Sequence, residues 1–206
     1  MSQTDLIQQL RAARVVPVVR TSSADHAATA VAWLREAGIR IFEITMTIPN
    51  AVALIGRLSR DADLLVGAGT VPDAATARAC LDAGARFLVA PWVDPALSEP
   101  CRKVGAALML GALTPTEVRA ALAAGADVVK VFPASSAGGP GHIKALASVF
   151  PDVAFCPTGG VEPGNVAAYL SAGAAFVGMG GALVDEKRIA ANDKAAIQAA
   201  ARAVLS

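Results

Sequence analysis

The chain has 206 residues, of which 54% are hydrophobic and 17% are charged, and its formal net charge is +1. This length fits one domain, residues 1–206, and the apolar composition excludes a chain that is mainly disordered. A charge near zero without a strongly basic run excludes electrostatic binding of nucleic acids or anionic membranes as the main function.

The N-terminus combines polar and acidic residues where an export signal would place a cationic end and an apolar core. Elsewhere Gly, Pro or charged residues interrupt the apolar stretches before they reach the roughly 20 residues that a membrane span needs. We therefore expect a soluble, cytoplasmic protein with neither a membrane partner nor a nucleic-acid partner. The cysteines Cys80, Cys101 and Cys156 lack metal-ligand spacing, so we expect small buried thiols without a chemical role.

Eight short apolar runs, each a candidate strand, alternate with helical segments along the chain. They cover residues 15–20, 39–44, 64–67, 87–90, 106–110, 128–131, 153–156 and 175–178. A helix at 3–13 precedes the first run, and the last helix is expected at 187–204. An Ala-Gly pair recurs between a helix and the next strand, for example at Gly38 and Gly84, which is typical of helix C-caps in repeated βα units.

Eight strands that are each followed by a helix favour a (β/α)8 TIM barrel of the α/β class, with an additional N-terminal helix at its lower end. An open, doubly wound sheet is the alternative. In a barrel the carboxyl ends of all strands meet at one mouth, where active sites form. The residues that interrupt the apolar pattern at these ends are therefore the candidates for chemistry.

Lys130 is the only charged residue in the run 128–131, and a loop rich in Gly, Pro and Ser follows it. Burial removes hydration from an ammonium group, so we expect part of this side chain to be the free amine that attacks ketones. Two structural explanations compete with a nucleophile. The lysine could pair with a buried carboxylate, or it could extend out of the end of the strand into water.

Glu43 is a lone carboxylate in the run 39–44, just as Lys130 is a lone amine in its own run. Near an amine, a buried carboxylate is able to move protons. An ion pair that only satisfies both charges is the alternative. Arg20, Thr70 and Thr158 also stand at or after strand ends, so we expect them at the same mouth.

Glycine-rich loops follow the last two strands. The first contains Gly159 and Gly160, and the second contains Gly180 and Gly181. Loops at this place in a barrel commonly hold a phosphate on backbone N–H groups and a short helix N-terminus. Glycines also form ordinary turns, but two such loops at this pair of strands favour a phosphate site.

Five segments form a recognisable combination. They are Glu43-Ile44-Thr45-Met46-Thr47, Gly67-Ala68-Gly69-Thr70-Val71, Ala90-Pro91, Val129-Lys130-Val131-Phe132-Pro133-Ala134 and Cys156-Pro157-Thr158-Gly159-Gly160-Val161. Together, in order within residues 15–185, they resemble the family of 2-keto-3-deoxy-6-phosphogluconate (KDPG) and 4-hydroxy-2-oxoglutarate (KHG) aldolases.

The resemblance implies a class I pyruvate aldolase, a lyase that uses neither a metal nor a cofactor. Lys130 would form the Schiff base with the C2 ketone of a 2-keto-4-hydroxy acid, and Glu43 would move protons while the imine forms and the C3–C4 bond breaks. The family implies that Thr70 holds the pyruvate carboxylate, that Pro91 and Phe132 shape the pocket, and that Thr158, Gly159 and Gly160 face the distal hydroxyls and phosphate. It also implies a homotrimer.

The expected reaction is cleavage of KDPG to pyruvate and glyceraldehyde 3-phosphate. KHG or the galactonate epimer of KDPG is the alternative substrate within the same chemistry. A barrel that binds phosphate without turnover, or a trimeric scaffold, is the alternative from another class. The presence of both Glu43 and Lys130 speaks against a loss of turnover.

The chain departs at two positions from well-known members of that family. Thr47 stands where some members carry an arginine that binds the pyruvate carboxylate. We therefore expect Arg20 to supply the positive charge beside the hydroxyls of Thr47 and Thr70. Gly181 stands where many members have a serine in the phosphate loop, which leaves backbone donors for the phosphate.

Overall fold

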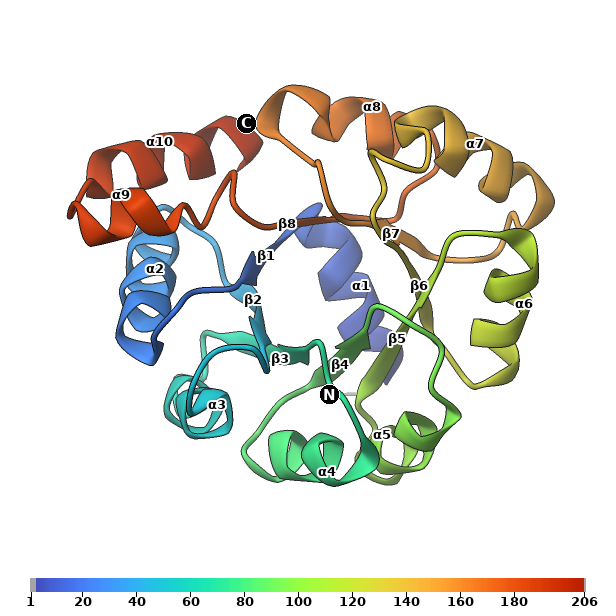
Figure 1. The fold of residues 1–206 in the computed structure, drawn as a ribbon, viewed down its shortest axis with the longest axis horizontal. Helices are drawn as coiled ribbons and strands as arrows, with labels where there is room; N and C mark the ends of the chain where they lie inside the picture. The colour runs from blue at the N-terminus through green and yellow to red at the C-terminus, as the bar shows by residue number, and fades with distance from the viewer. Residues whose placement is uncertain (1–2, 206) are drawn as a thin grey trace.

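Eight parallel strands form the centre of the computed structural model, which describes residues 3–205 (Figure 1). The strands are β1 Val15–Val19, β2 Ile41–Thr45, β3 Leu65–Gly69, β4 Phe87–Ala90, β5 Ala107–Ala112, β6 Val128–Val131, β7 Phe155–Pro157 and β8 Val177–Met179. Their order in the sheet is β7-β6-β5-β4-β3-β2-β1-β8. Isolated bridges from Phe155 to Ala174 and from Thr158 to Gly178 join the two ends of the sheet. The predicted (β/α)8 barrel is thus confirmed, and the open sheet is excluded.

Helices surround the barrel, as Figure 1 shows. They are α1 Gln3–Ala13, α2 Ala24–Glu36, α3 Ala51–Leu58, α4 Ala74–Asp82, α5 Ser98–Val104, α6 Pro115–Ala123, α7 Gly139–Val149, α8 Val166–Ser171, α9 Glu186–Ala190 and α10 Lys194–Leu205, with short 3-10 turns at Pro95–Leu97 and Pro163–Asn165. Side-chain caps begin several of them: Thr114 and Glu117 form the capping box of α6. Within residues 3–205 none of these helices has the length and hydropathy needed to cross a bilayer.

The final helix is shorter than predicted, because the expected segment 187–204 divides into α9 and α10. Asn192 adopts a left-handed backbone conformation with φ of 57°, which a continuous helix does not allow. The side chain of Asp193 then accepts a hydrogen bond from the N–H of Ala196 at 3.2 Å and begins α10 anew. Strand ends also differ by one to two residues from the predicted ranges, and β3 continues to Gly69.

Two apolar layers follow from the alternation of side chains along the strands. Residues such as Phe42 and Val129 point outwards and pack against the surrounding helices. Residues such as Ile41 and Val128 point into the barrel, where they pack below the mouth in the layer that also contains Leu6 of α1. Glu43 and Lys130 come two residues after these inward-facing positions, so both point into the barrel.

Helix α1 covers the end of the barrel opposite the mouth (Figure 1). Leu6 and Leu10 are completely buried there. The amide of Gln3 donates hydrogen bonds to the carbonyl of Ala106 at 3.1 Å and to the carboxylate of Asp127 at 2.8 Å. Burial raises the pKa of the Asp127 carboxyl, although bonds from Gln3 and the Leu108 N–H oppose this. This helix is therefore fixed in place as a cap, as the sequence predicted.

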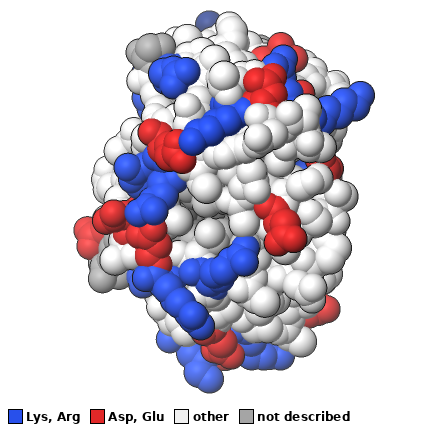
Figure 2. All heavy atoms as spheres, turned by 90° about the vertical axis from the view of Figure 1, so that its left-hand side faces the viewer, with Lys and Arg blue, Asp and Glu red and all other residues white. Residues whose placement is uncertain are grey.

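The face formed by α2 and α9 carries basic and acidic side chains that alternate over the surface (Figure 2). Ion pairs explain part of this mixture: Arg35 lies 2.8 Å from Asp61, and Arg188 lies 3.0 Å from Asp193. Neither sign of charge forms a continuous patch on this face. The arrangement agrees with the formal net charge of +1.

Candidate active site

Lys130 lies in β6 with only 4% of its surface exposed. Its Nζ donates to Glu43 Oε1 at 3.2 Å and lies 3.5 Å from Oε2. The ammonium group is therefore paired with a buried carboxylate, which was one of the two structural explanations predicted. The same lysine also lines an open cavity, so its amine is accessible to a substrate.

Glu43 reaches Lys130 from β2, and it too is 4% exposed. Neighbouring β3 passes close to its carboxylate at Gly69. A Cβ atom at Gly69 would overlap the carboxylate oxygen, so the glycine leaves the space that the acid occupies. The geometry places a proton donor and a proton acceptor in direct contact at the floor of the cavity, as acid–base chemistry requires.

A cavity of about 390 Å³ opens at the carboxyl ends of the strands, which is a size suited to a small organic substrate. Its lining comprises Val18, Arg20, Thr70, Pro91, Lys130, Phe132, Thr158, Gly159, Gly160, Val161, Glu162, Gly180, Gly181 and Ala182. All the predicted site residues except Glu43 and Thr47 are in this lining. Glu43 lies below the cavity, in contact with Lys130.

Arg20 and Thr70 form one side of the cavity. The guanidinium of Arg20 follows β1 and donates to the hydroxyl of Thr70, after β3, at 3.1 Å. Thr70 has a left-handed backbone with φ of 55°, an uncommon conformation for threonine. Thr47 does not line the cavity; its hydroxyl lies 2.8 Å from that of Thr45, which donates to the carbonyl of Val19. A contact between Thr47 and a substrate therefore stays a prediction.

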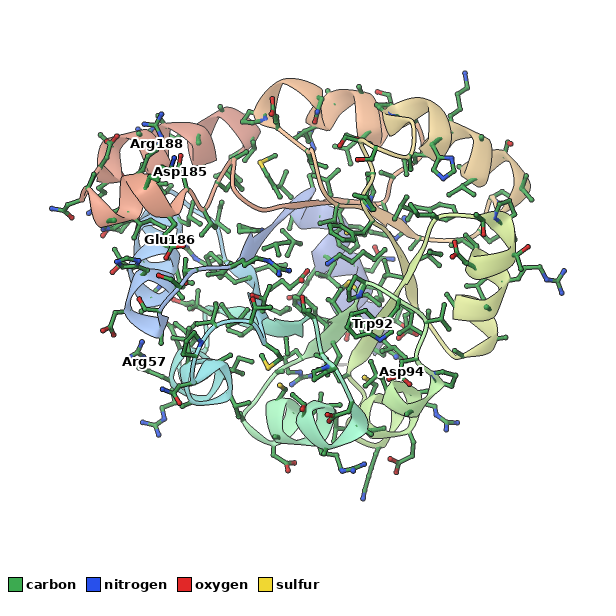
Figure 3. The ribbon with its side chains drawn as sticks, viewed as in Figure 1. Arg57, Trp92, Asp94, Asp185, Glu186 and Arg188 are labelled. Carbon is green, nitrogen blue, oxygen red and sulfur yellow. The ribbon has the colours of Figure 1, made fainter. Side chains whose placement is uncertain are left out.

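The loop that carries Arg20 is attached to α9 by Glu186. Figure 3 shows Glu186 between α2 and α9. Its carboxylate accepts hydrogen bonds from the Ser22 N–H at 2.7 Å and hydroxyl at 2.6 Å, and it lies 3.0 Å from Nδ1 of His26. The bonds from Ser22 and His26 lower the pKa of Glu186 to about 2. The carboxylate is thus charged at neutral pH and connects the segments that follow β1 and β8.

The loops after β7 and β8 form another part of the cavity wall, next to the segment that carries Arg20, because β8 pairs with β1. Within residues 3–205 no acceptor is bonded to the backbone N–H groups of Gly159, Gly160, Val161, Gly181 and Ala182. Thr158, which is 6% exposed, presents its hydroxyl near Gly178, where a Cβ atom would collide with it. Unsatisfied donors gathered at a cavity rim are suited to an anion or to a polar group with many acceptors.

Pro91 and Phe132 complete the rim. Phe132 is exposed, and Nζ of Lys130 lies 5.9 Å from the centre of its ring. The peptide bond between Phe132 and Pro133 is cis. Trp92 follows Pro91 and is 42% exposed at the mouth (Figure 3). Apolar rings thus border the side of the cavity away from β8.

Cys156 lies beside Lys130 in the register of β6 and β7. Burial raises the pKa of its thiol to about 12, so the thiol does not compete with the lysine as a nucleophile. Cys80 and Cys101 are also free and buried, and burial raises their pKa values to about 11 and about 12. The prediction of small buried thiols is confirmed.

Four residues of the lining were not predicted from the sequence: Val18, Val161, Glu162 and Ala182. Three of them are apolar and carry no chemical signal. Glu162 is different, because it is a charged residue two positions after the glycine pair Gly159 and Gly160. Ser135 is not part of the lining, but its hydroxyl lies so close to Gly160 that a Cβ atom there would overlap it.

The fold and the site together define a class of enzyme. A (β/α)8 barrel whose buried amine and carboxylate meet below an open cavity is suited to covalent catalysis on a carbonyl compound, as in Schiff-base aldolases.

The model of the KDPG and KHG aldolase family matches residues 6–200, so the chain belongs to this family and is an aldolase. Among known proteins, the 2-dehydro-3-deoxy-phosphogluconate aldolase of Treponema pallidum is 34% identical over 97% of this chain and 96% of its own. The KHG/KDPG aldolase of Escherichia coli is 32% identical over 76% of this chain and 74% of its own.

A solved structure of KDPG aldolase from Legionella pneumophila matches the fold with a TM-score of 0.87 and 33% identity. The match covers 96% of this chain and 97% of the other. That structure holds pyruvate, captured at low pH as a covalent carbinolamine intermediate. The resemblance predicted from the five sequence segments is therefore confirmed.

Proposed function

We propose that this aldolase cleaves KDPG to pyruvate and glyceraldehyde 3-phosphate through a Schiff base on Lys130. The observation that carries the proposal is the contact between Lys130 and Glu43 at the floor of a cavity whose rim presents unbonded N–H groups. The names of the Treponema and Legionella relatives support the same substrate.

The reaction begins when the neutral amine of Lys130 attacks the C2 ketone and forms a carbinolamine. Glu43 takes up and returns the protons that allow water to leave, and an iminium results. The C4 hydroxyl then loses its proton to the carboxylate, directly or through water, and the C3–C4 electron pair moves into the iminium. The aldehyde departs, and an enamine of pyruvate remains. Protonation at C3 and hydrolysis release pyruvate and restore the amine.

The two sides of the cavity suit the two ends of this substrate. Arg20 and Thr70 offer a positive charge and a hydroxyl for the pyruvate carboxylate. On the other side, Thr158 and the glycine loops around Gly160 and Gly181 offer a hydroxyl and backbone donors for the distal phosphate. The substrate would therefore lie across the mouth with C2 above Lys130.

KHG is the second candidate substrate, because the relative from Escherichia coli is named for both activities and Gly181 offers no side-chain hydroxyl for a phosphate. The galactonate epimer of KDPG is a third candidate within the same chemistry. Comparing kcat/KM for the three compounds identifies the preferred substrate. We also propose that the protein acts in the cytoplasm as a homotrimer, which sedimentation at several concentrations would test.

Chemical trapping tests the Schiff base. Incubation with pyruvate and borohydride should add the mass of reduced pyruvate to one lysine, and peptide mapping should identify Lys130. Lys130→Arg should abolish both labelling and turnover, because a guanidinium stays protonated. Lys144→Arg, a control outside the cavity lining, should leave both unchanged. Labelling of Lys103 or Lys144 in the wild type would refute the assignment, and absence of any adduct would favour a barrel without turnover.

A further inference from the structure

The charged side chains that line the cavity are unevenly distributed. Within the described residues they are Arg20, Lys130 and Glu162. Arg20 extends across the end of β2 towards Thr70, away from β7 and β8, and Lys130 is directed to Glu43. The rim formed by the loops after β7 and β8 therefore has one charged residue in the lining, and this residue is acidic.

Asn165 fixes the position of Glu162. Its Oδ1 accepts the N–H of Glu162 at 2.9 Å, while its Nδ2 donates to the carbonyl of Gly160 at 3.0 Å. The loop is thus held on both sides by a single amide. The N–H of Glu162 is consequently occupied, unlike those of Gly159, Gly160 and Val161, and does not contribute to binding an anion.

The charge of Glu162 has no cationic partner among residues 3–205. Its exposed side chain stands two residues after Gly160 and lines the same cavity as the unbonded N–H groups, and it forms a capping box with Asn165 at the start of the 3-10 turn Pro163–Asn165. A phosphate group on these donors would carry close to two negative charges at neutral pH. It would meet an uncompensated carboxylate of the same sign, whereas a distal hydroxyl is neutral and is able to donate a hydrogen bond to that carboxylate.

We propose that Glu162 is a specificity-determining residue that weakens binding of a distal phosphate relative to a distal hydroxyl. This inference rests on the proposed aldolase function and concerns the same cavity. It assigns to this chain a preference shifted towards unphosphorylated or weakly charged 2-keto-4-hydroxy acids.

The test compares KDPG with unphosphorylated 2-keto-3-deoxygluconate in the wild type and in Glu162→Gln. Removing the charge should lower KM for KDPG about 3- to 10-fold at low salt, as expected for one like charge near a solvent-exposed phosphate. KM for the unphosphorylated compound should not fall. The difference in KM for KDPG should shrink as salt is raised, because the interaction is screened.

Two matched variants complete the experiment. Glu162→Asp keeps the charge and should retain the wild-type preference. Asp152→Asn removes one negative charge in the turn before β7, at the other end of the barrel, and should leave KM for both substrates unchanged. An equal KM for KDPG in the wild type and Glu162→Gln would overturn the proposal, as would an equal improvement for both substrates or a failure of both proteins to cleave KDPG.

Trapping with pyruvate separates this inference from the proposed function, because pyruvate has no distal group to meet Glu162. Failure to label Lys130 would count against the aldolase mechanism itself. Successful labelling with an unchanged KM for KDPG in Glu162→Gln would count against the role of Glu162 alone.

Discussion

Lys130 donates a hydrogen bond to Glu43, with Nζ and Oε1 3.2 Å apart, and both side chains are almost completely buried. A buried ion pair contributes little net stability, because desolvation of both charges offsets their attraction. Only the neutral amine attacks a ketone, so the carboxylate has a chemical task as the nearest group that accepts the proton. Loss of turnover on removal of the carboxylate would distinguish a working pair from one that only satisfies its charges.

Glu43→Gln should lower turnover by about two to four orders of magnitude, because the amide keeps the shape but does not exchange protons. Single-turnover and steady-state rates with KDPG measure the effect. The circular dichroism spectrum should not change. A variant with near-normal turnover would reduce Glu43 to a counter-ion.

Arg20→Ala should lower kcat/KM for pyruvate-forming cleavage by roughly one to two orders of magnitude, since a charge-assisted hydrogen bond contributes about 1.5 to 3 kcal/mol. Arg20→Lys should restore only part of the loss, because lysine lacks the two-pronged guanidinium. A structure with bound pyruvate in which Arg20 points away from the carboxylate would contradict this role.

Lys130 and Glu43 were predictable because a charge inside an apolar run is conspicuous. The contact between them was not, since it depends on the closure that brings β2 and β6 to the same interior. The position of Thr47 was not predictable either: a hydroxyl is able to bond to its own neighbours, and here it meets Thr45. Glu162 escaped prediction because the glycines before it dominated the interpretation of that loop.

Among the elements, β3 has the most specific effect on the site. The predicted strand ended at Gly67, whereas the observed strand Leu65–Gly69 also includes Gly69. Gly69 provides the space for Glu43, and Gly67 faces the ring of Phe87 in the same manner. Glycine is thus required in this strand because side chains of the neighbouring strands occupy the space beside it. The hydrophobic pattern of the strand alone does not reveal this requirement.

Gly69→Ala should lower kcat by about tenfold to a hundredfold, because the added methyl group displaces the Glu43 carboxylate from Lys130. The measurement is kcat together with the melting temperature. Gly56→Ala in α3 is the matched control: its Cβ atom would meet only Ala83 at an ordinary 3.8 Å, so activity should be unchanged. Equal activity in both variants would show that Glu43 tolerates displacement.

At the scale of the whole molecule, the eight strands and their alternation with helices were predictable, because each βα unit repeats the same sequence pattern. The break at Asn192 was not, since Asn occurs within helices as well as at their ends. The three cysteines are distributed over α4, α5 and β7 and are all buried. Exposure of each thiol would therefore indicate local unfolding in a different part of the barrel.

The native protein should resist alkylation by iodoacetamide at pH 8, because thiols with pKa values of about 11 to 12 are almost wholly protonated and are also inaccessible. In urea all three should react. Mass spectrometry over time counts the modified residues. Rapid labelling of Cys156 alone in the native state would show that the barrel opens at β7.

Each neighbouring strand pair other than β7 and β8 has consecutive residues in register, whereas these two strands share isolated bridges. The unbonded N–H groups at Gly160 and Gly181 stand on opposite sides of this seam. A ligand that accepts hydrogen bonds from both loops would link β7 and β8, the neighbouring strands with the least backbone pairing in the barrel. The melting temperature of the protein would then rise with occupancy of this site. Release of the distal product would remove the link between β7 and β8 until the next substrate binds.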